Sequence, residues 1–106
     1  MYIKNEKNHK ALAQALYSIA IERWHPSIIN YELTEIDNIL SSSAILGRTL
    51  SDSGIPASEK REIVTDIFKN ILSPVSLGLL DLLIEENKVH MIKDISKSYR
   101  RFLTCE

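Results

Sequence analysis

The hydrophobic positions along the chain recur with the spacing of amphipathic helices. In six successive segments, apolar residues return every three or four positions, which places them on one face of an α-helix. The pattern predicts helices over residues 5–23, 26–41, 44–50, 57–71, 74–86 and 88–103. Because six helices with short connections pack around one another, we expect an all-α, six-helix bundle that forms a single compact domain.

The residues between these segments are ones that begin or end helices. Pro26 and Pro74 suit the first helical position, and Ser73 precedes Pro74 as a candidate N-cap. The serines at 41–43 offer further N-cap hydroxyls. Asn87 tolerates the left-handed backbone conformation that often ends a helix, so it predicts the end of the fifth helix.

Two of the six helices carry more apolar surface than an outer helix needs. Projected at 100° per residue, the apolar side chains of 72–86 cover an arc of about 220°, whereas a surface helix needs a stripe only a little over 100° wide. The helix at 5–23 has an arc of roughly 200° by the same projection. The segments 57–71, with a stripe from Ile63 to Ile71, and 88–103 have stripes of ordinary width and are expected to be outer helices.

The surplus has two interpretations. A helix that runs through the middle of a bundle is covered on most sides, and a wide apolar arc is then core alone. In the second interpretation the first and fifth helices lie side by side and share an exposed apolar groove. Because a contiguous exposed apolar patch usually marks a partner site, an amphipathic helix laid into the groove is the expected partner.

Composition and charge narrow the classes of partner. The 106-residue chain is 44% hydrophobic and 25% charged, as in a soluble globular domain, and its formal net charge is −1. A near-neutral chain has no global electrostatic attraction for nucleic acid or anionic lipid. The N-terminus shows no secretion signal and no apolar run has the length of a membrane span. The single cysteine, Cys105, suits a reducing compartment.

No set of residues has the spacing of a catalytic, cofactor or metal site. His9, His25 and His90 are far apart, and no HExxH or CxxC motif is present. The three glycines stand alone rather than in a phosphate-binding loop. We therefore predict that the chain is not an enzyme and holds no cofactor or metal.

Three further features have structural interpretations. Lys97, Arg100 and Arg101 are interpreted as complementing the dipole at the end of the last helix, with phosphate contact as the alternative. The serine run at 41–43 is interpreted as a helix boundary rather than a nucleophile. Trp24 is interpreted as a core or junction anchor rather than a ligand contact.

The order of the helical motifs resembles a known family. LAQALYSIA at 12–20 is similar to the Tyr-Ala-Lys-Ala-Leu-Phe-x-x-Ala pattern, IPASEK at 55–60 to an Ile-x-x-x-Glu-Lys element, and LSPVSLGLLDLLIEENKV at 72–89 to a Leu-Ser-Pro and leucine-rich helix. MIKDI at 91–95 corresponds to the start of the final helix. In this order the motifs resemble the N-terminal domain of the F-type ATP synthase delta subunit, whose mitochondrial counterpart is the oligomycin-sensitivity-conferring protein.

The chain departs from the family pattern at four positions. Leu12 replaces an aromatic residue, and Gly78 stands where Asn is common. Asn87 replaces a Gly, and Lys93 replaces a Pro. The first two departures fall at the predicted groove.

The resemblance implies that residues 1–106 are a delta-subunit N-terminal helical domain, without the stalk-binding C-terminal region. It implies a stator component that binds the N-terminal helix of an alpha subunit between the first and fifth helices during proton-driven ATP synthesis. Contact with the b subunit is expected to be indirect, through the missing region. The expected place is the cytoplasmic face of a bacterial cell membrane, peripheral and as part of F1. The partner-binding residues that it predicts are Leu12, Ala15, Gly78, Leu79 and Leu82.

Two alternatives from other functional classes stay open. One is a helical nucleic-acid-binding module that uses Lys97, Arg100 and Arg101, which salt-dependent binding would reveal. The other is an adaptor that pairs its own apolar arcs in a homodimer, which sedimentation would reveal.

Overall fold

The computed structural model is a bundle of helices, without strands in the part of the chain that it describes. It describes residues 5–23 and 25–104, with side chains for 9–23 and 25–104, so Trp24 and Cys105 lie outside the described residues. Within this part the all-α, six-helix prediction is confirmed. The elements are α1 (Asn5–Arg23), α2 (Pro26–Ser42), α3 (Ala44–Ser51), α4 (Ala57–Phe68), α5 (Pro74–Glu85), the short 3₁₀ helix η1 (Val89–Met91) and α6 (Ile92–Thr104).

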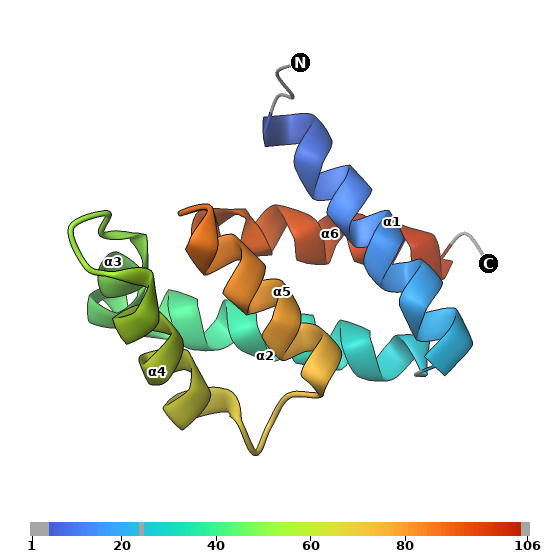
Figure 1. The fold of residues 1–106 in the computed structure, drawn as a ribbon. Coiled ribbons are helices and arrows are strands. Elements are labelled where there is room, and N and C mark those ends of the chain that lie inside the picture. Colours follow the sequence, from blue (N-terminus) through green and yellow to red (C-terminus); the bar gives the residue numbers. More distant parts are fainter. Residues whose placement is uncertain (1–4, 24, 105–106) are drawn as a thin grey trace.

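The helices are arranged so that α2 and α6 pack on each other while α1 and α5 cross over them (Figure 1). α1 packs mainly on α6 and also on α2, and α5 packs on α4, η1 and α2. In Figure 1, α5 lies between α4 and α1. α1 and α5 make few close backbone approaches to each other. Their relative position is therefore set largely through the helices beneath them.

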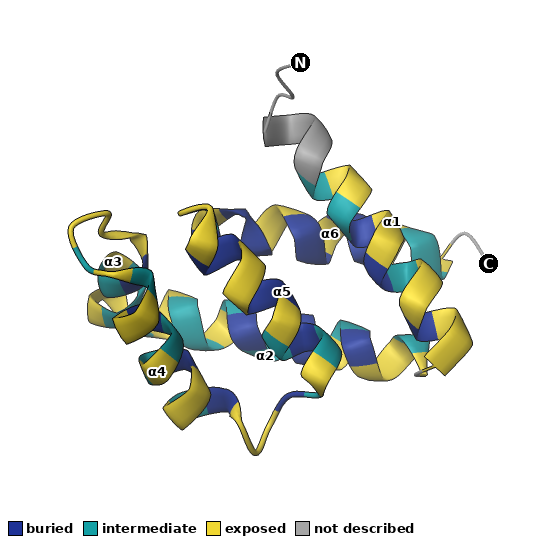
Figure 2. Ribbon diagram, in the orientation of Figure 1, coloured by how far each residue is buried: buried dark blue, intermediate teal, exposed yellow. Residues whose placement is uncertain are grey.

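The core is built from the apolar face of each helix. Ile29, Leu33 and Ile36 of α2 are fully buried, at the helical spacing that the sequence predicted. Ile95 and Tyr99 of α6, which packs on α2, are also fully buried and belong to the same core. Figure 2 shows the buried residues on the inward faces of α2, α5 and α6 and the exposed residues on the outward faces.

Several helix ends are made by the residues that the sequence indicated. α2 begins at Pro26, the first helical position predicted for it, and Nδ1 of the preceding residue, His25, accepts the backbone N–H of Ser27 at 3.4 Å. At the start of α3, Oγ of Ser43 accepts the backbone N–H of Leu46 at 3.2 Å. Asn87 follows α5 with a φ of 57°, the left-handed conformation expected of it. These three helix ends confirm the corresponding predictions.

The start of α5 differs from the expected capping arrangement. Ser73 occupies the N-cap position, but it makes no side-chain cap to the α5 amides. Its hydroxyl donates instead to Oε1 of Glu32 on α2, at 2.8 Å. Ser73 is thus correctly placed at the helix boundary, while its side chain forms a tertiary contact.

The fourth helix is shorter than predicted. α4 ends at Phe68 rather than at residue 71, and the chain then makes a tighter turn in which the backbone N–H of Ile71 bonds to the carbonyl oxygen of Phe68, three residues back. The turn buries Leu72 and leaves Ile71 45% exposed. Pro74 also disfavours helical backbone at the residue before it. The prediction that Ile71 continues the buried stripe is therefore wrong.

The last predicted helix is divided into two elements. The backbone N–H of Met91 bonds to the carbonyl oxygen of Lys88, which closes the 3₁₀ turn Val89–Met91 before α6 begins at Ile92. Val89, Met91 and Ile92 are all buried. The tighter winding of a 3₁₀ turn accounts for the break in a segment that was predicted as one α-helix.

A buried lysine joins the start of α4 to the end of α5. Lys60 is only 2% exposed, and its Nζ donates to Oδ1 of Asn87 at 3.4 Å. An ammonium group beside a helix C-terminus interacts favourably with the helix dipole. Asn87 therefore serves both as the left-handed residue that ends α5 and as the acceptor for Lys60.

Candidate partner-binding site

One face of α1 and one face of α5 line an open groove. On each helix the lining positions recur every three or four residues, so that each set lies along one side of its helix. The groove has a volume of about 310 Å³ and is lined by apolar residues alone. We call this surface the α1–α5 groove; its lining residues are Leu12, Ala15, Leu16, Ile19, Pro74, Val75, Gly78, Leu79 and Leu82.

All five residues predicted for partner binding line the α1–α5 groove. Leu79 is buried and Leu12 is half-buried, so both also take part in the packing of the bundle. Ala15 and Gly78 are exposed, and Leu82 is 44% exposed. The structure thus brings the predicted residues of α1 and those of α5 into one groove, although three helices separate them in the sequence. Their role in binding stays a prediction.

Four lining residues were missed by the sequence prediction. Leu16 and Ile19 continue the α1 face at helical spacing from Leu12, and Ile19 is 41% exposed. Pro74 and Val75 form the α5 end of the same surface. The helical spacing of Leu12, Leu16 and Ile19 was the signal for the α1 residues. Pro74 was not predicted as a lining residue because its position as the first residue of a helix already accounted for the proline.

The wide apolar arc of α5 is used in two ways. Leu80, Leu83 and Ile84 are buried, so the core interpretation holds for most of the arc. Leu82 remains exposed and lies in the α1–α5 groove. The surplus over an ordinary stripe is therefore divided between the core and this surface.

Gly78 leaves one side of the groove without a side chain. A Cβ atom built on Gly78 would meet no heavy atom within 4 Å, and its backbone φ is not positive. A glycine inside a helix costs about 0.5–1 kcal/mol relative to alanine. Neither the backbone nor the packing of this chain requires glycine here. An open glycine permits another backbone to approach closely.

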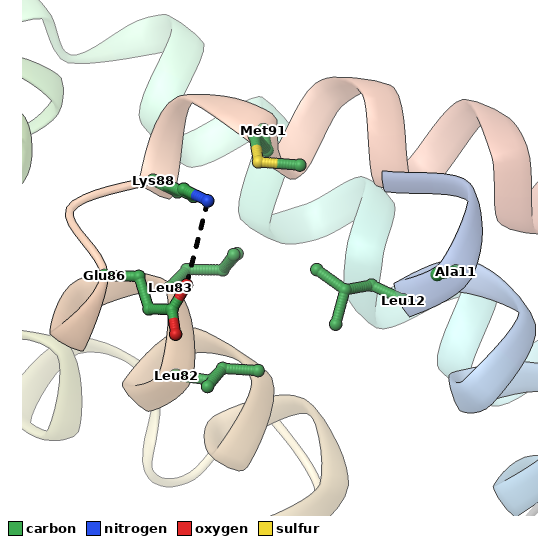
Figure 3. A pocket seen from close by; sticks show the side chains of 7 residues that line it. All are labelled: Ala11, Leu12, Leu82, Leu83, Glu86, Lys88 and Met91. Atoms are coloured by element: carbon green, nitrogen blue, oxygen red, sulfur yellow. Dashed lines mark ion pairs between the residues drawn. The ribbon is translucent and has the colours of Figure 1, made fainter. Parts of the chain in front are cut away.

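The groove continues into a second hollow, of about 230 Å³, near the N-terminal part of α1. Leu12 and Leu82 line both hollows and point toward one another across this end (Figure 3). Beyond them, Nζ of Lys88 lies 3.8 Å from Oε1 of Glu86. Met91 completes the apolar part of the hollow. The surface therefore passes from an apolar centre to an end that carries both charges.

The comparison with known proteins agrees with the motif order. Residues 9–106 match the family model for the ATP synthase delta (OSCP) subunit. The chain belongs to this family. The family resemblance that the sequence motifs indicated is thereby confirmed.

Curated relatives of the delta subunit family come from bacteria. The ATP synthase subunit delta of Citrifermentans bemidjiense is 30% identical over 94 residues, which cover 88% of this chain and 52% of the relative. Those of Clostridium botulinum (strain Loch Maree) and Bacillus licheniformis are 32% identical over 91 residues and 30% identical over 90 residues. The match to the Clostridium botulinum protein covers 82% of this chain and 51% of that relative. The match to the Bacillus licheniformis protein covers 85% of this chain and 48% of that relative. The chain spans about half the length of the curated relatives it matches. No solved structure matches it.

A candidate metal site and a candidate membrane span are both absent from the residues that the structure describes. Within residues 5–23 and 25–104, no group of three or more His, Cys, Asp or Glu side chains is placed to hold a metal ion. In the same part of this delta-family chain, none of the helices has the length and apolar character needed to cross a membrane.

The basic residues of α6 form a separate exposed surface. Lys97, Arg100 and Arg101 are exposed and, with Thr104, surround a shallow hollow that shares no residue with the α1–α5 groove. Nη2 of Arg100 donates to Oγ of Ser96 at 3.4 Å. Arg101 lies in the last turn of α6, where a positive charge fits the predicted interaction with the helix dipole.

Proposed function

We propose that this chain is a non-catalytic stator component of an F-type ATP synthase and that its α1–α5 groove receives the N-terminal helix of an alpha subunit. The observation that carries the proposal is a continuous groove, lined only by apolar residues, between two helix faces of a chain that belongs to the delta family. An amphipathic helix laid into a groove is a recurrent mode of protein recognition. Apolar side chains without hydrogen-bonding groups favour such a partner over a polar small molecule.

The dimensions and energetics of the groove support a short helical partner. From Leu12 to Ile19 the α1 side of the groove extends about 10 Å, or roughly two helical turns. Covering the exposed parts of Ile19 and Leu82, at about 25 cal/mol per Å² of apolar surface, contributes several kcal/mol before the costs of association. Gly78 and Ala15 give a helix backbone room to approach between these larger side chains.

In the assembled enzyme this contact would hold the domain on the catalytic head. We propose that it helps to tie the F1 head to the peripheral stalk, so that the head does not turn with the rotor during proton-driven ATP synthesis. Contact with the b subunit is proposed to be indirect. The proposed place is peripheral, at the cytoplasmic face of the cell membrane as part of F1, without nucleic acid or direct membrane insertion. Membership of the delta family supports each part of this proposal.

A calorimetric titration tests the proposed contact. The probe is a synthetic peptide of about 20 residues, roughly 30 Å of helix, from the N-terminus of the alpha subunit encoded in the same genome. We expect binding with micromolar or lower Kd, and at least a tenfold loss in the variant Leu82→Asp, because the aspartate would be desolvated against the peptide. The matched control is Ile45→Asp on α3, which replaces a 74% exposed isoleucine outside the groove and should leave Kd unchanged.

Other outcomes distinguish the remaining functional classes. If the wild-type chain gives no heat of binding at micromolar concentrations, the proposal is contradicted. Equal losses of peptide affinity in Leu82→Asp and Ile45→Asp would contradict it as well. Salt-dependent binding of an oligonucleotide that is lost when Lys97, Arg100 and Arg101 are changed to Gln would favour a nucleic-acid module. A dimer in sedimentation that Leu82→Asp dissociates would favour self-association.

A further inference from the structure

A carboxylate is buried between α2 and the start of α5. Glu32 is 5% exposed, and its Oε1 accepts the hydroxyls of Ser73 at 2.8 Å and Ser76 at 2.6 Å. Its Oε2 accepts the backbone N–H of Ser73 at 2.8 Å. Ser76 itself is fully buried. These three donors, from two serines of one helix start, satisfy a charged group that would otherwise be costly to bury.

The two serines bracket residues that line the groove. Pro74 and Val75 lie between Ser73 and Ser76 in the first turn of α5, and both line the α1–α5 groove. No α5 side chain caps this turn, and it contains no acidic residue. Glu32 therefore supplies the negative charge that the N-terminal end of a helix dipole favours. The first turn of α5 is held by a neighbouring helix rather than by its own residues.

The same neighbouring helix supports the opposite wall of the groove. α1 packs on α2 and α6, and α5 packs on α2, while α1 and α5 make few close backbone approaches. The separation of the two walls is consequently set through the helices beneath them. The Glu32 hydrogen bonds fix α5 to this shared support at the Pro74 end of the groove.

We propose that Glu32 is a positioning residue for the partner helix. Acting through Ser73 and Ser76, it holds the first turn of α5 at the distance from α1 that admits a helix. The inference rests on the proposed function for the identity of the partner, whereas the spacing of α1 and α5 is a property of the free chain. Glu32 does not line the groove itself, so its effect on the partner is indirect.

Spin-label distances measure that spacing directly. Labels are attached to cysteines introduced by Gln14→Cys on α1 and Asp81→Cys on α5, in a Cys105→Ser background of the full 106-residue chain. Gln14 and Asp81 are exposed and do not line the groove. Double electron–electron resonance then gives the distance distribution between the two helices, and calorimetry with the alpha-subunit peptide gives Kd for the same variants.

Two variants and one control carry the test. Glu32→Gln keeps the shape of the side chain but turns an amide donor toward the donors of the serines, and Ser76→Ala removes a single donor. The control, Glu35→Gln, makes the same change at the next glutamate of α2, which is half-buried and does not line the groove. We expect Glu32→Gln to broaden the distance distribution and to weaken peptide binding by roughly tenfold, since a smaller fraction of molecules has a competent groove. Ser76→Ala should act in the same direction and less strongly, and the control should match the wild type.

An unchanged distance distribution in folded Glu32→Gln would overturn the inference. A broadened distribution with wild-type peptide affinity would also overturn it, since the spacing would then not matter to the partner. If Glu32→Gln does not fold, Ser76→Ala is judged by the same two criteria. If the wild-type chain does not bind the peptide, the proposed function fails. The distance distribution alone then decides whether Glu32 sets the spacing.

Discussion

The hydroxyl of Tyr99 donates a hydrogen bond to the backbone carbonyl oxygen of Pro26 at 2.8 Å. Tyr99 is fully buried on α6, and Pro26 is the first residue of α2. The Tyr99 ring also meets the Tyr17 ring of α1 edge-on, with the centroids 5.9 Å apart. One side chain of α6 therefore connects α1, which lines the groove, with α2 and α6, on which α1 packs.

Replacement of Tyr99 by phenylalanine should weaken the bundle. Tyr99→Phe keeps the ring contact with Tyr17 but leaves the carbonyl oxygen of Pro26 without this donor. We expect a loss of about 1 kcal/mol in the free energy of unfolding, the typical value of one hydrogen bond. Urea unfolding followed by circular dichroism measures this change. Equal stabilities of the variant and the wild type would show that the bond contributes nothing net.

The same tyrosine should make stability depend on alkaline pH. Burial raises the pKa of Tyr99 from 10.0 to about 12 in the folded chain, whereas the unfolded chain loses this proton near pH 10. The stabilising contribution is therefore complete below about pH 10 and is lost as the pH rises from 10 to 12. Because one pKa unit corresponds to about 1.4 kcal/mol, this loss exceeds the ~1 kcal/mol of the hydrogen bond. The unfolding free energy of the wild type should therefore fall to that of Tyr99→Phe and then below it as the pH rises across this range. A constant difference between them would contradict the assignment.

Gly78 offers a test that separates stability from binding. Gly78→Ala should stabilise the free chain by about 0.5–1 kcal/mol, because alanine is the better helix former and the added methyl group meets open space. Gly78→Leu should also fold, but its side chain should fill part of the groove and weaken the binding of the alpha-subunit peptide. Gly47→Ala on α3, where the Cβ makes ordinary contact at 3.6 Å, is the control that should leave the peptide affinity unchanged. Full peptide affinity in Gly78→Leu would argue against a helix seated at this position.

Asn87 should be sensitive to the kind of residue that replaces it. Asn87→Ala leaves a residue in the left-handed conformation without the short polar side chain that lets asparagine tolerate it, and it also removes the acceptor of buried Lys60. We therefore expect a loss of about 2 kcal/mol in the free energy of unfolding. Asn87→Gly removes the acceptor but fits the backbone, and should cost less. Thermal or urea unfolding of both variants decides the order. A glycine variant that is less stable than the alanine variant would contradict the backbone argument.

Most of the fold was accessible from local patterns. The spacing of Ile29, Leu33 and Ile36 predicted a buried face that the structure contains, and Ser43 and Asn87 predicted helix ends correctly. Such signals depend on neighbours within a few residues, which a sequence displays directly. The error at Ile71 arose because the burial of the adjacent Leu72 turned the chain before the helical pattern ended.

The site was only partly accessible, for a physical reason. The family resemblance indicated the five residues that the structure brings into one groove, but the roles of Ile19 and Val75 depend on how α1 and α5 are oriented. Glu32 lies beside the apolar stripe of α2, three positions after Ile29 and four before Ile36, but the sequence does not show which donors its carboxylate meets. Its partners Ser73 and Ser76 are 41 and 44 positions away, so only the tertiary structure reveals that the carboxylate is buried.

The most direct test of the groove is an NMR titration of the ¹⁵N-labelled chain with the unlabelled alpha-subunit peptide. If the groove seats the partner helix, the largest changes in amide chemical shift should fall on the facing sides of α1 and α5, with Ala15, Gly78 and Leu82 among them, while α3 stays nearly unchanged. Largest changes on the exposed face of α6 or on α3, or spectra that do not change at saturating peptide, would contradict the account.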